Sequence, residues 1–195
     1  MNKPIRIEIV PYNPEWPAEF RRVAAPLRAA LGDLALRIDH IGSTAVPGLA
    51  AKDVIDVQVT ATTLDAAAFA AALAPLDYRR WEDITQDHVP PGCDDPPEEW
   101  RKLYFQPPRG QRRIHLHIRQ VGRANQRYAL LFRDYLRADP TAAGAYRQIK
   151  EALARLHPDD QEAYYDVKDP VCDLIIGAAE RWAVATGYAP GPSNL

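Results

Sequence analysis

The sequence has few cysteines and no long apolar run. Its two cysteines, Cys93 and Cys172, are far apart and show no CxxC spacing, so the sequence indicates neither a zinc knuckle nor a disulfide framework. No stretch of about 18 apolar residues occurs, and the N-terminal residues lack the apolar core of a secretory signal. We therefore expect a cytoplasmic protein that does not span a membrane.

The chain also lacks a charge excess of either sign. Its formal net charge is -2 over 195 residues, whereas nucleic-acid-binding domains usually carry a strong basic excess. This balance argues against a general nucleic-acid binder. A chain of this length can bury a core as one domain, so neither a disulfide nor a structural metal is needed for stability.

Apolar periodicity outlines the first half of the chain. Residues 5–10 alternate apolar and charged side chains, which predicts a strand. Asn13 followed by Pro14 predicts the start of a helix that runs to about Leu31. Further predicted elements are strands at 36–41 and 53–60 and an alanine-rich helix that begins after Thr63 and ends at Pro75.

The second half begins with residues 85–97, which show no periodicity and predict an exposed, mobile loop. Strands at 101–106 and 113–120 with a short connection follow, and then three amphipathic helices. These patterns predict an α+β fold with a mixed sheet, flanking helices and a helical C-terminal half. We expect one domain over 1–195, with a core at 1–120 and a helical part at 121–195.

The segment DHIGSTAVPGLAAKDVIDVQ carries the clearest chemical signal. Gly42, Ser43 and Thr44 follow a predicted strand and form a turn whose donors suit a phosphate. The next strand places Asp56 and Gln58 on one face, because alternate strand residues share a face. A carboxylate beside such a turn can bring a magnesium ion to a triphosphate. The alternatives are an ordinary turn and an Asp56 that caps a helix or forms a structural ion pair.

A second signal is the strand IHLHI, which places His115 and His117 on one face. These imidazoles are candidates for lining a pocket or binding a metal, and the alternative is a half-buried histidine pair with a structural role. The surrounding segment, 101–127, contains eight Lys or Arg and no Asp or Glu. Such a block predicts a local surface that faces an anion.

Three further residues are candidates for contacting a ligand. His40 precedes the glycine turn on the same strand face as Gly42, with a structural hydrogen bond as the alternative. Lys52 and Lys102 are candidates for pairing with a phosphate, although exposed lysines are usually only solvated.

Several motifs together resemble the GrpB family, an uncharacterised family of the nucleotidyltransferase superfamily. They are VPYNPEW near the start, DHIGSTAVPGLAAKDVIDV, the HLHI strand, and FRDYLRADP followed by Tyr146, Lys150, Tyr164 and Lys168. The resemblance covers nearly the whole chain, and its HIGSTAVPGL segment is specific.

The resemblance implies a nucleotidyltransferase-like core, in which a Gly-Ser turn binds the phosphates and carboxylates on adjacent strands hold two magnesium ions. Gly42 and Ser43 match that turn, and Asp56 matches the first catalytic carboxylate. The chain departs from the pattern at Gln58, where a second carboxylate is expected, and at the strand of His115 and His117, where a third is expected. An amide is a poor ligand for magnesium, so this departure predicts a weakened two-metal site.

Two functions follow from these residues and the resemblance. The first is transfer of a nucleotidyl group from a nucleoside triphosphate to an acceptor, with Asp56 and a histidine holding a divalent metal such as Mg²⁺ and Lys52 or an arginine neutralising charge. The second, which Gln58 favours, is a catalytically inactive module that binds a nucleotide or another phosphorylated metabolite.

The resemblance also suggests a link to coenzyme A biosynthesis, because GrpB-like domains occur fused to dephospho-coenzyme A kinase. A third interpretation, nucleic-acid binding, requires the basic block to form one continuous stripe.

Overall fold

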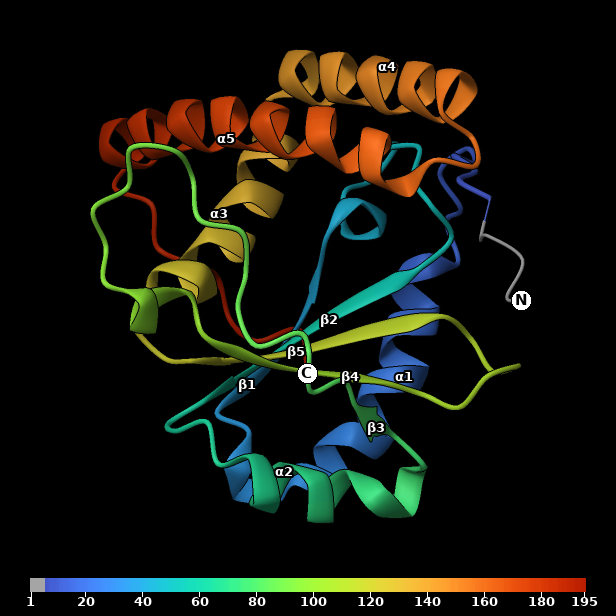
Figure 1. The fold of residues 1–195 in the computed structure, drawn as a ribbon. Coiled ribbons are helices and arrows are strands. Elements are labelled where there is room, and N and C mark those ends of the chain that lie inside the picture. Colours follow the sequence, from blue (N-terminus) through green and yellow to red (C-terminus); the bar gives the residue numbers. More distant parts are fainter. Residues whose placement is uncertain (1–5) are drawn as a thin grey trace.

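The computed structural model describes residues 6–195 and contains one mixed β-sheet (Figure 1). Its strand order is β1-β2-β5-β4-β3, with β2 and β5 parallel and the other neighbouring pairs antiparallel. The strands are β1 (Arg37–Ile41), β2 (Ile55–Ala61), β3 (Arg79–Arg80), β4 (Lys102–Gln106) and β5 (Ile114–Gln120). The mixed sheet and the antiparallel β4–β5 pair confirm the sequence prediction.

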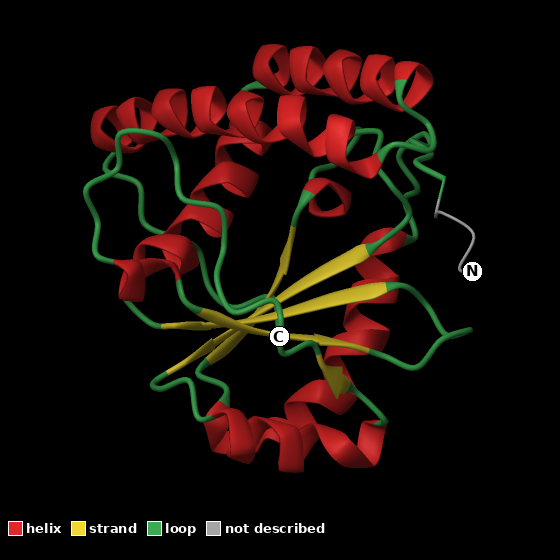
Figure 2. Cartoon of the chain, viewed as in Figure 1, coloured by secondary structure: helices red, strands yellow, loops and turns green. Residues whose placement is uncertain are grey.

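Helices cover both faces of this sheet (Figure 2). The helices α1 and α2 lie on one face, and α3, α4 and α5 form a layer on the other (Figure 1). Their bounds are α1 (Trp16–Leu31), α2 (Ala66–Leu73), α3 (Ala124–Ala138), α4 (Pro140–Leu156) and α5 (Gln161–Thr186). The helical C-terminal half is thereby confirmed. Across residues 6–195, no helix combines the length and the apolar content that crossing a bilayer would require.

The period-2 pattern of the central strands divides the sheet into an apolar face and a polar face. In β2, Ile55, Val57 and Val59 are fully buried against α1 and α2. Ile114, Leu116 and Ile118 of β5 join the same core. Because successive side chains point to opposite faces, the intervening polar residues of β2, β4 and β5 all face the C-terminal helices. The fold therefore places a polar sheet surface beneath a helical layer.

The first element differs from the sequence prediction. Residues 6–9 form no strand, and Val10 makes only an isolated antiparallel bridge with Ala51. Ile5, the first residue of the predicted strand, lies outside the described residues. A single bridge satisfies the Val10 backbone without a full ladder, because the Val10 N–H bonds the Ala51 carbonyl and the Ala51 N–H bonds the Val10 carbonyl.

Two helix starts also differ from the prediction. Helix α1 begins at Trp16, and the Asn13 side chain instead accepts a hydrogen bond from the Glu15 N–H just before the helix. Helix α2 is capped by Asp65, whose carboxylate accepts from the N–H groups of Ala67 and Ala68. One carboxylate that satisfies two free N–H groups explains why Asp65 is the cap and Thr63 is not.

Residues 85–97 contain no helix or strand apart from the bridge between Gln86 and Arg101 and the start of a 3₁₀ turn at Pro97. The prediction of an exposed loop is wrong at Asp87, however. Its side chain is only 17% exposed and pairs with Lys102 and Arg119. Two charge-assisted contacts attach this segment to the polar face of the sheet.

Candidate functional site

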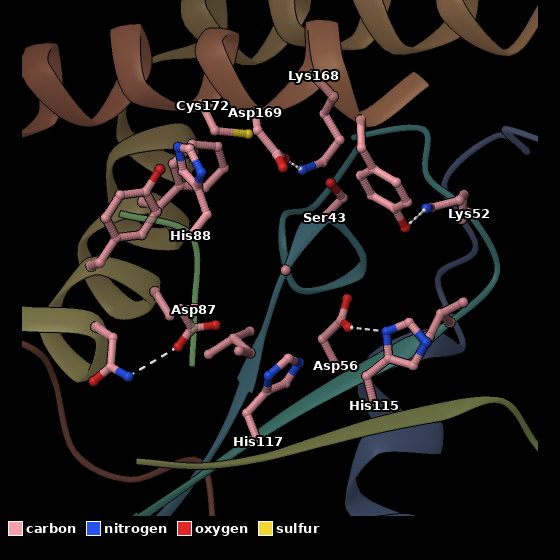
Figure 3. Close-up of a pocket in the computed structure, with 18 of the residues that line it drawn as sticks. Ser43, Lys52, Asp56, Asp87, His88, His115, His117, Lys168, Asp169 and Cys172 are labelled. Carbon is pink, nitrogen blue, oxygen red and sulfur yellow. Dashed lines mark hydrogen bonds and ion pairs between the residues drawn. The ribbon is translucent and has the colours of Figure 1, made fainter. Parts of the chain in front are cut away.

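A cavity of about 460 Å³ lies between the polar face of the sheet and the C-terminal helices. In Figure 3, Lys168, Asp169 and Cys172 extend toward it from α5, while Asp56 and His117 face it from the strands. Its wall combines the turn after β1, the loop that carries Asp87, and residues of α3 and α4. The cavity thus joins the sheet, the loop and the helical half.

The turn after β1 is pressed against Asp56. Gly42 has φ +70° and ψ -173°, a conformation that is open almost only to glycine. A Cβ at this position would lie 2.3 Å from the Asp56 Oδ2 atom. Glycine therefore permits both the turn geometry and the close approach of its backbone to the carboxylate.

Ser43 and Thr44 follow this glycine and have different surroundings. The Ser43 hydroxyl accepts a hydrogen bond from Lys150 Nζ at 2.9 Å, and both residues line the cavity. Thr44 is 1% exposed, and its hydroxyl donates to the Val54 carbonyl and contacts His40 Nε2 at 3.0 Å. Ser43 is thus oriented toward the cavity by a cation, whereas Thr44 fixes the turn internally.

Lys150 is a buried cation with neutral hydrogen-bond partners. It is 2% exposed, and its Nζ donates to Ser43 Oγ and, at 2.6 Å, to the Ala50 carbonyl. The same Nζ lies 4.6 Å from the centre of the Tyr146 ring. Burial, together with repulsion from Lys168, lowers the Lys150 pKa to about 7. This lysine is therefore poised to gain charge when an anion approaches.

Two more lysines, Lys52 and Lys168, line the same cavity next to tyrosines of α5. Lys52 donates to the Tyr165 hydroxyl at 2.7 Å and lies over the rings of Tyr164 and Tyr165, 5.0 and 4.6 Å from their centres. Lys168 donates to Asp169 at 2.8 Å. The Tyr164 hydroxyl is buried and has no hydrogen-bond partner within residues 6–195. We call Lys52, Lys150 and Lys168 the lysine wall.

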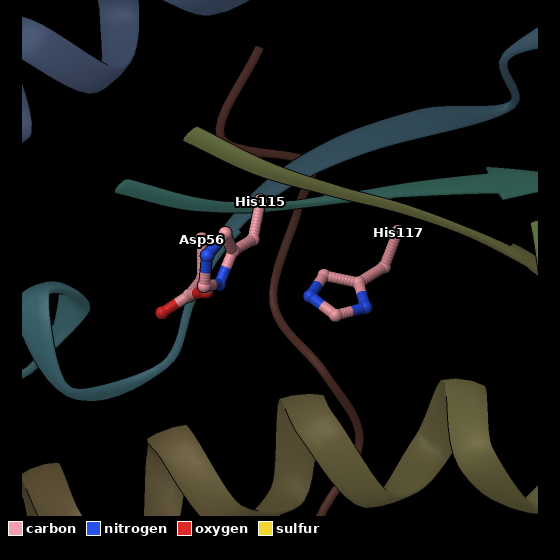
Figure 4. Close-up of side chains that lie close together, drawn as sticks. All are labelled: Asp56, His115 and His117. Carbon is pink, nitrogen blue, oxygen red and sulfur yellow. The ribbon is translucent and has the colours of Figure 1, made fainter. Parts of the chain in front are cut away.

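Opposite the lysine wall, Asp56, His115 and His117 converge (Figure 4). Asp56 and His115 are register partners in the parallel β2–β5 pair, and His115 Nδ1 lies 3.1 Å from Asp56 Oδ1. One potential ligand atom of each of the three residues lies within 4.8 Å of the other two. Burial, reinforced by the charges of Arg119 and Lys102, lowers the His117 pKa well below its usual value. The three side chains form one cluster of potential metal ligands.

Gln58 shares a strand face with Asp56 but does not reach the cavity. It is fully buried, its Nε2 donates to the Gln126 carbonyl, and its Oε1 accepts from Arg119 at 2.6 Å. Arg119 in turn binds Asp87, which also accepts from Lys102 at 2.7 Å. The amide is thus required as donor and acceptor at once, which a carboxylate could not provide.

Most of the residues singled out from the sequence line this one cavity. They are Gly42, Ser43, Thr44, Lys52, Asp56, Lys102, His115 and His117. His40 is not among them, because it faces α1, where its ring stacks on Phe20 with centres 4.8 Å apart. Burial lowers the His40 pKa to about 4, so it stays neutral and holds Thr44.

The basic block at 101–127 does not form a continuous stripe. Lys102 and Arg119 turn into the sheet face and pair with Asp87. Other members pair with acidic residues from separate segments, in the contacts Arg101–Glu98, Arg112–Glu19, Arg112–Asp53, Arg123–Glu99 and Arg127–Glu180. Six of the eight basic residues of the block are therefore paired with acidic residues.

Sequence reasoning gave no site role to four residues that line the cavity, Asp87, Lys150, Lys168 and Tyr164. One signal was present for Lys150, because it lies four residues after Tyr146 and three before Leu153, on the buried side of α4. A lysine at an apolar position of an amphipathic helix points to a buried cation. Asp87 gave no such signal within its irregular segment.

Comparison with known proteins adds family information. A family model described as GrpB protein matches residues 6–177. A protein named dephospho-CoA kinase from Mycolicibacterium paratuberculosis is 38% identical over 94% of this chain, and the match covers 48% of that protein. A UPF0157 protein of Pseudomonas aeruginosa is 39% identical over 89% of this chain and 68% of its own length. This chain thus spans about half the length of the mycobacterial relatives.

A solved structure is also similar to this chain. The crystal structure of the conserved protein GrpB from Enterococcus faecalis superposes with a TM-score of 0.73 at 29% sequence identity. The match covers 90% of this chain and 99% of that one. The similarity therefore extends through the sheet and the helical layer that together enclose the cavity.

Proposed function

The chain belongs to the GrpB family, and from that premise we propose that its central cavity binds a nucleotide or another phosphorylated metabolite through the phosphates. The glycine-serine turn and the lysine wall meet at the Lys150–Ser43 hydrogen bond. Phosphate oxygens accept from hydroxyl, backbone and ammonium donors, all of which this corner of the cavity offers.

One observation carries this proposal, namely the buried ammonium group of Lys150, which has no acidic hydrogen-bond partner among the described residues. A buried charge is costly unless it is paired, and both acceptors of Lys150 are neutral oxygens. Lys52 and Lys168 add to the cost, since their charges lower its pKa. A bound anion would remove this penalty, so binding energy is available to a phosphate at this position.

The rest of the cavity suits a less polar part of the same ligand. Trp100, Tyr128 and Phe132 line it, and the Tyr128 and Phe132 rings are stacked with centres 6.1 Å apart. A ligand with phosphates at one end and a flat or apolar group at the other would match both ends. Several relatives are named dephospho-CoA kinase, so a coenzyme A precursor belongs in the set of candidate ligands.

A second candidate function is nucleotidyl transfer, which the contact between Gly42 and Asp56 favours. The turn that would hold phosphates is pressed directly onto the carboxylate, so a phosphate held there would lie beside Asp56. An acceptor hydroxyl in the same cavity could then attack the α-phosphate and displace pyrophosphate.

The residues around Asp56 do not fit a pair of magnesium ions. Gln58 is committed to Gln126 and Arg119, and the adjacent strand presents His115 and His117. Magnesium prefers an octahedral set of oxygen ligands, and this set offers one carboxylate and two imidazoles.

Thermal unfolding with metal-free protein in a chelator tests the binding proposal. The probes are inorganic triphosphate, nucleoside triphosphates and coenzyme A precursors. A ligand at about 100 times its Kd should add roughly 2.7 kcal/mol, or about 5 to 10 °C in Tm for a chain of this size. Lys150→Met should abolish the shift, whereas Arg147→Met, which removes an exposed charge from the same helix, should retain it. If no probe shifts the Tm of the wild type, or if Lys150→Met responds as the wild type does, the proposal is wrong.

A separate assay for pyrophosphate tests the second function. Release of pyrophosphate that Asp56→Ala abolishes would establish nucleotidyl transfer.

A further inference from the structure

The cluster of Asp56, His115 and His117 differs from a two-magnesium site and has the composition and geometry of a site for one transition-metal ion. Its potential ligand atoms lie within 4.8 Å of one another. Ligands about 2.1 Å from a tetrahedral zinc ion lie about 3.4 Å apart, so no two of the three atoms need to approach by more than about 1.4 Å. Small side-chain rotations at the strand surface can supply that movement.

We infer that these three residues bind a single transition-metal ion of the Zn²⁺ class, in preference to magnesium. Imidazole nitrogen suits zinc and its neighbours in the first transition row, whereas magnesium prefers oxygen ligands. Two histidines and one carboxylate are a set that catalytic zinc sites use. The inference deepens the proposed function, because it gives the same cavity a metal opposite the lysine wall.

The existing contacts indicate which nitrogen of each imidazole is available. The Nδ1 atom of His115 already contacts Asp56 Oδ1, and the Nδ1 atom of His117 lies 3.5 Å from the Arg119 guanidinium. The 3.1 Å between His115 Nδ1 and Asp56 Oδ1 is close to the spacing of two ligands on one zinc ion, so we assign these two atoms as ligands. The third ligand that we assign is Nε2 of His117, the nitrogen that does not face Arg119.

Binding at His117 Nε2 has one local consequence. The ring proton must then reside on Nδ1, which faces Arg119. This is the longest of the Arg119 contacts, since the bonds to Asp87 and Gln58 are 2.8 and 2.6 Å. Arg119 can therefore give up the His117 contact and keep its shorter hydrogen bonds.

Three protein ligands leave a coordination position for a further group. The cluster, the lysine wall and the Gly42–Ser43 turn all line one cavity. A phosphate oxygen or a water molecule can take the open position while the lysines bind the other phosphate oxygens. The geometry thus points to joint recognition of a phosphate by one metal ion and three lysines.

Metal titration of tag-free, chelator-treated protein without any phosphate tests this inference. Calorimetry with Zn²⁺ should show one ion per chain, and Mg²⁺ at a hundredfold excess should not displace it. Co²⁺, as a spectroscopic substitute, should give the intense visible bands of a four-coordinate site. His117→Gln and Asp56→Asn should each weaken Zn²⁺ binding at least about tenfold, because loss of even an outer-shell partner of a metal site typically costs about 10- to 100-fold. His157→Gln, outside the cavity, should bind as the wild type does.

Each outcome decides the inference separately from the proposed function. The inference is overturned if wild type binds no Zn²⁺ or gives only the weak bands of six-coordinate Co²⁺. It is also overturned if His117→Gln and Asp56→Asn both bind as wild type does, or if Mg²⁺ at a hundredfold excess displaces Zn²⁺. The anion shift described above is measured in a chelator, so its failure would overturn phosphate binding by the lysine wall and leave the metal result standing.

Discussion

Lys150 Nζ lies 2.9 Å from Ser43 Oγ, and this hydrogen bond joins α4 to the turn that follows β1. It connects the helical half of the chain to the sheet at the point where the cavity is most polar. The ammonium group that makes the bond is almost completely buried. The chemistry of the turn is therefore coupled to the protonation of one lysine on a distant helix.

The stability of the free protein should rise with pH because of Lys150. Its pKa is about 7 in the folded protein and about 10.4 in the unfolded chain. Between these values the unfolded state binds a proton that the folded state does not, so the free energy of unfolding increases with pH. Urea denaturation gives the free energy of unfolding at each pH from about 7 to 9.5. Its slope against pH should be steeper in wild type than in Lys150→Met by up to about 1.4 kcal/mol per pH unit. Equal slopes in the two proteins would contradict a lowered pKa of Lys150 in the folded state.

The affinity for phosphate should change with pH in the opposite sense. An anion favours the protonated lysine, so binding is strongest where Lys150 is charged and weakens as the pH rises above about 7. Titration with inorganic triphosphate between about pH 6.5 and 9 should show up to about tenfold loss per pH unit in wild type. Lys150→Arg stays charged throughout this range and should show a much flatter profile. A wild-type profile as flat as that of Lys150→Arg would remove Lys150 from the phosphate site.

Gly42→Ala should destabilise the protein more than Gly48→Ala. Both glycines have positive φ, +70° and +78°, so both substitutions introduce backbone strain of about 1 to 3 kcal/mol. Only at Gly42 would the new Cβ also meet Asp56 Oδ2, at 2.3 Å, whereas at Gly48 it meets nothing within 4 Å. Denaturation midpoints of the two variants should therefore differ, and equal losses would mean that Asp56 moves aside freely.

Gln58→Glu should destabilise the fold without creating a magnesium site. A carboxylate can still accept from Arg119, but it cannot donate to the Gln126 carbonyl, and an unsatisfied buried polar group costs about 1 to 3 kcal/mol. Chemical denaturation with and without Mg²⁺ measures both effects. Stabilisation of the variant by Mg²⁺, absent in wild type, would show that a carboxylate at this position reaches the cavity after all.

The parts of the site that were predictable from sequence are those encoded by local periodicity. The alternation in IDVQV and IHLHI places Asp56, His115 and His117 on the face opposite the core. Burial of the intervening residues enforces this placement, because a shift of one residue would expose the whole apolar set. The glycine-serine turn was recognisable for the same reason, since its residues are adjacent in sequence.

The remaining residues join the site through tertiary packing, and the helical periodicity around Lys150 indicates only that this lysine is buried, not what it contacts. Asp87 belongs to an irregular segment and is fixed only by its contacts with Lys102 and Arg119 on the sheet. Lys150 and Lys168 line the cavity because α4 and α5 belong to the helical layer over the polar face of the sheet (Figure 1). The helix starts were mispredicted for a different reason: neighbouring polar residues compete for the cap, and small differences in hydrogen bonding select among them.

The C-terminal residues should stabilise the outer edge of β1, and this can be tested with side-chain substitutions. Ser193 Oγ accepts from the Ile38 N–H and donates to its carbonyl, and Asn194 Oδ1 accepts from the His40 N–H. The Ile38 and His40 amides therefore bond side chains of the tail on the edge of β1 that faces away from β2. The double variant Ser193→Ala, Asn194→Ala leaves these backbone groups to water, and we expect a loss of about 1 to 3 kcal/mol.

Hydrogen exchange gives the local readout for this edge. The Ile38 and His40 amides should exchange faster in the double variant, whereas amides in the centre of β5 should change only as far as global stability falls. Leu195→Ala, which removes a side chain but keeps the hydrogen bond between the Leu195 N–H and Ser193, is the matched control. If the two β1 amides exchange at wild-type rates in the double variant, the tail does not protect the edge, because water or another part of the chain satisfies the strand equally well.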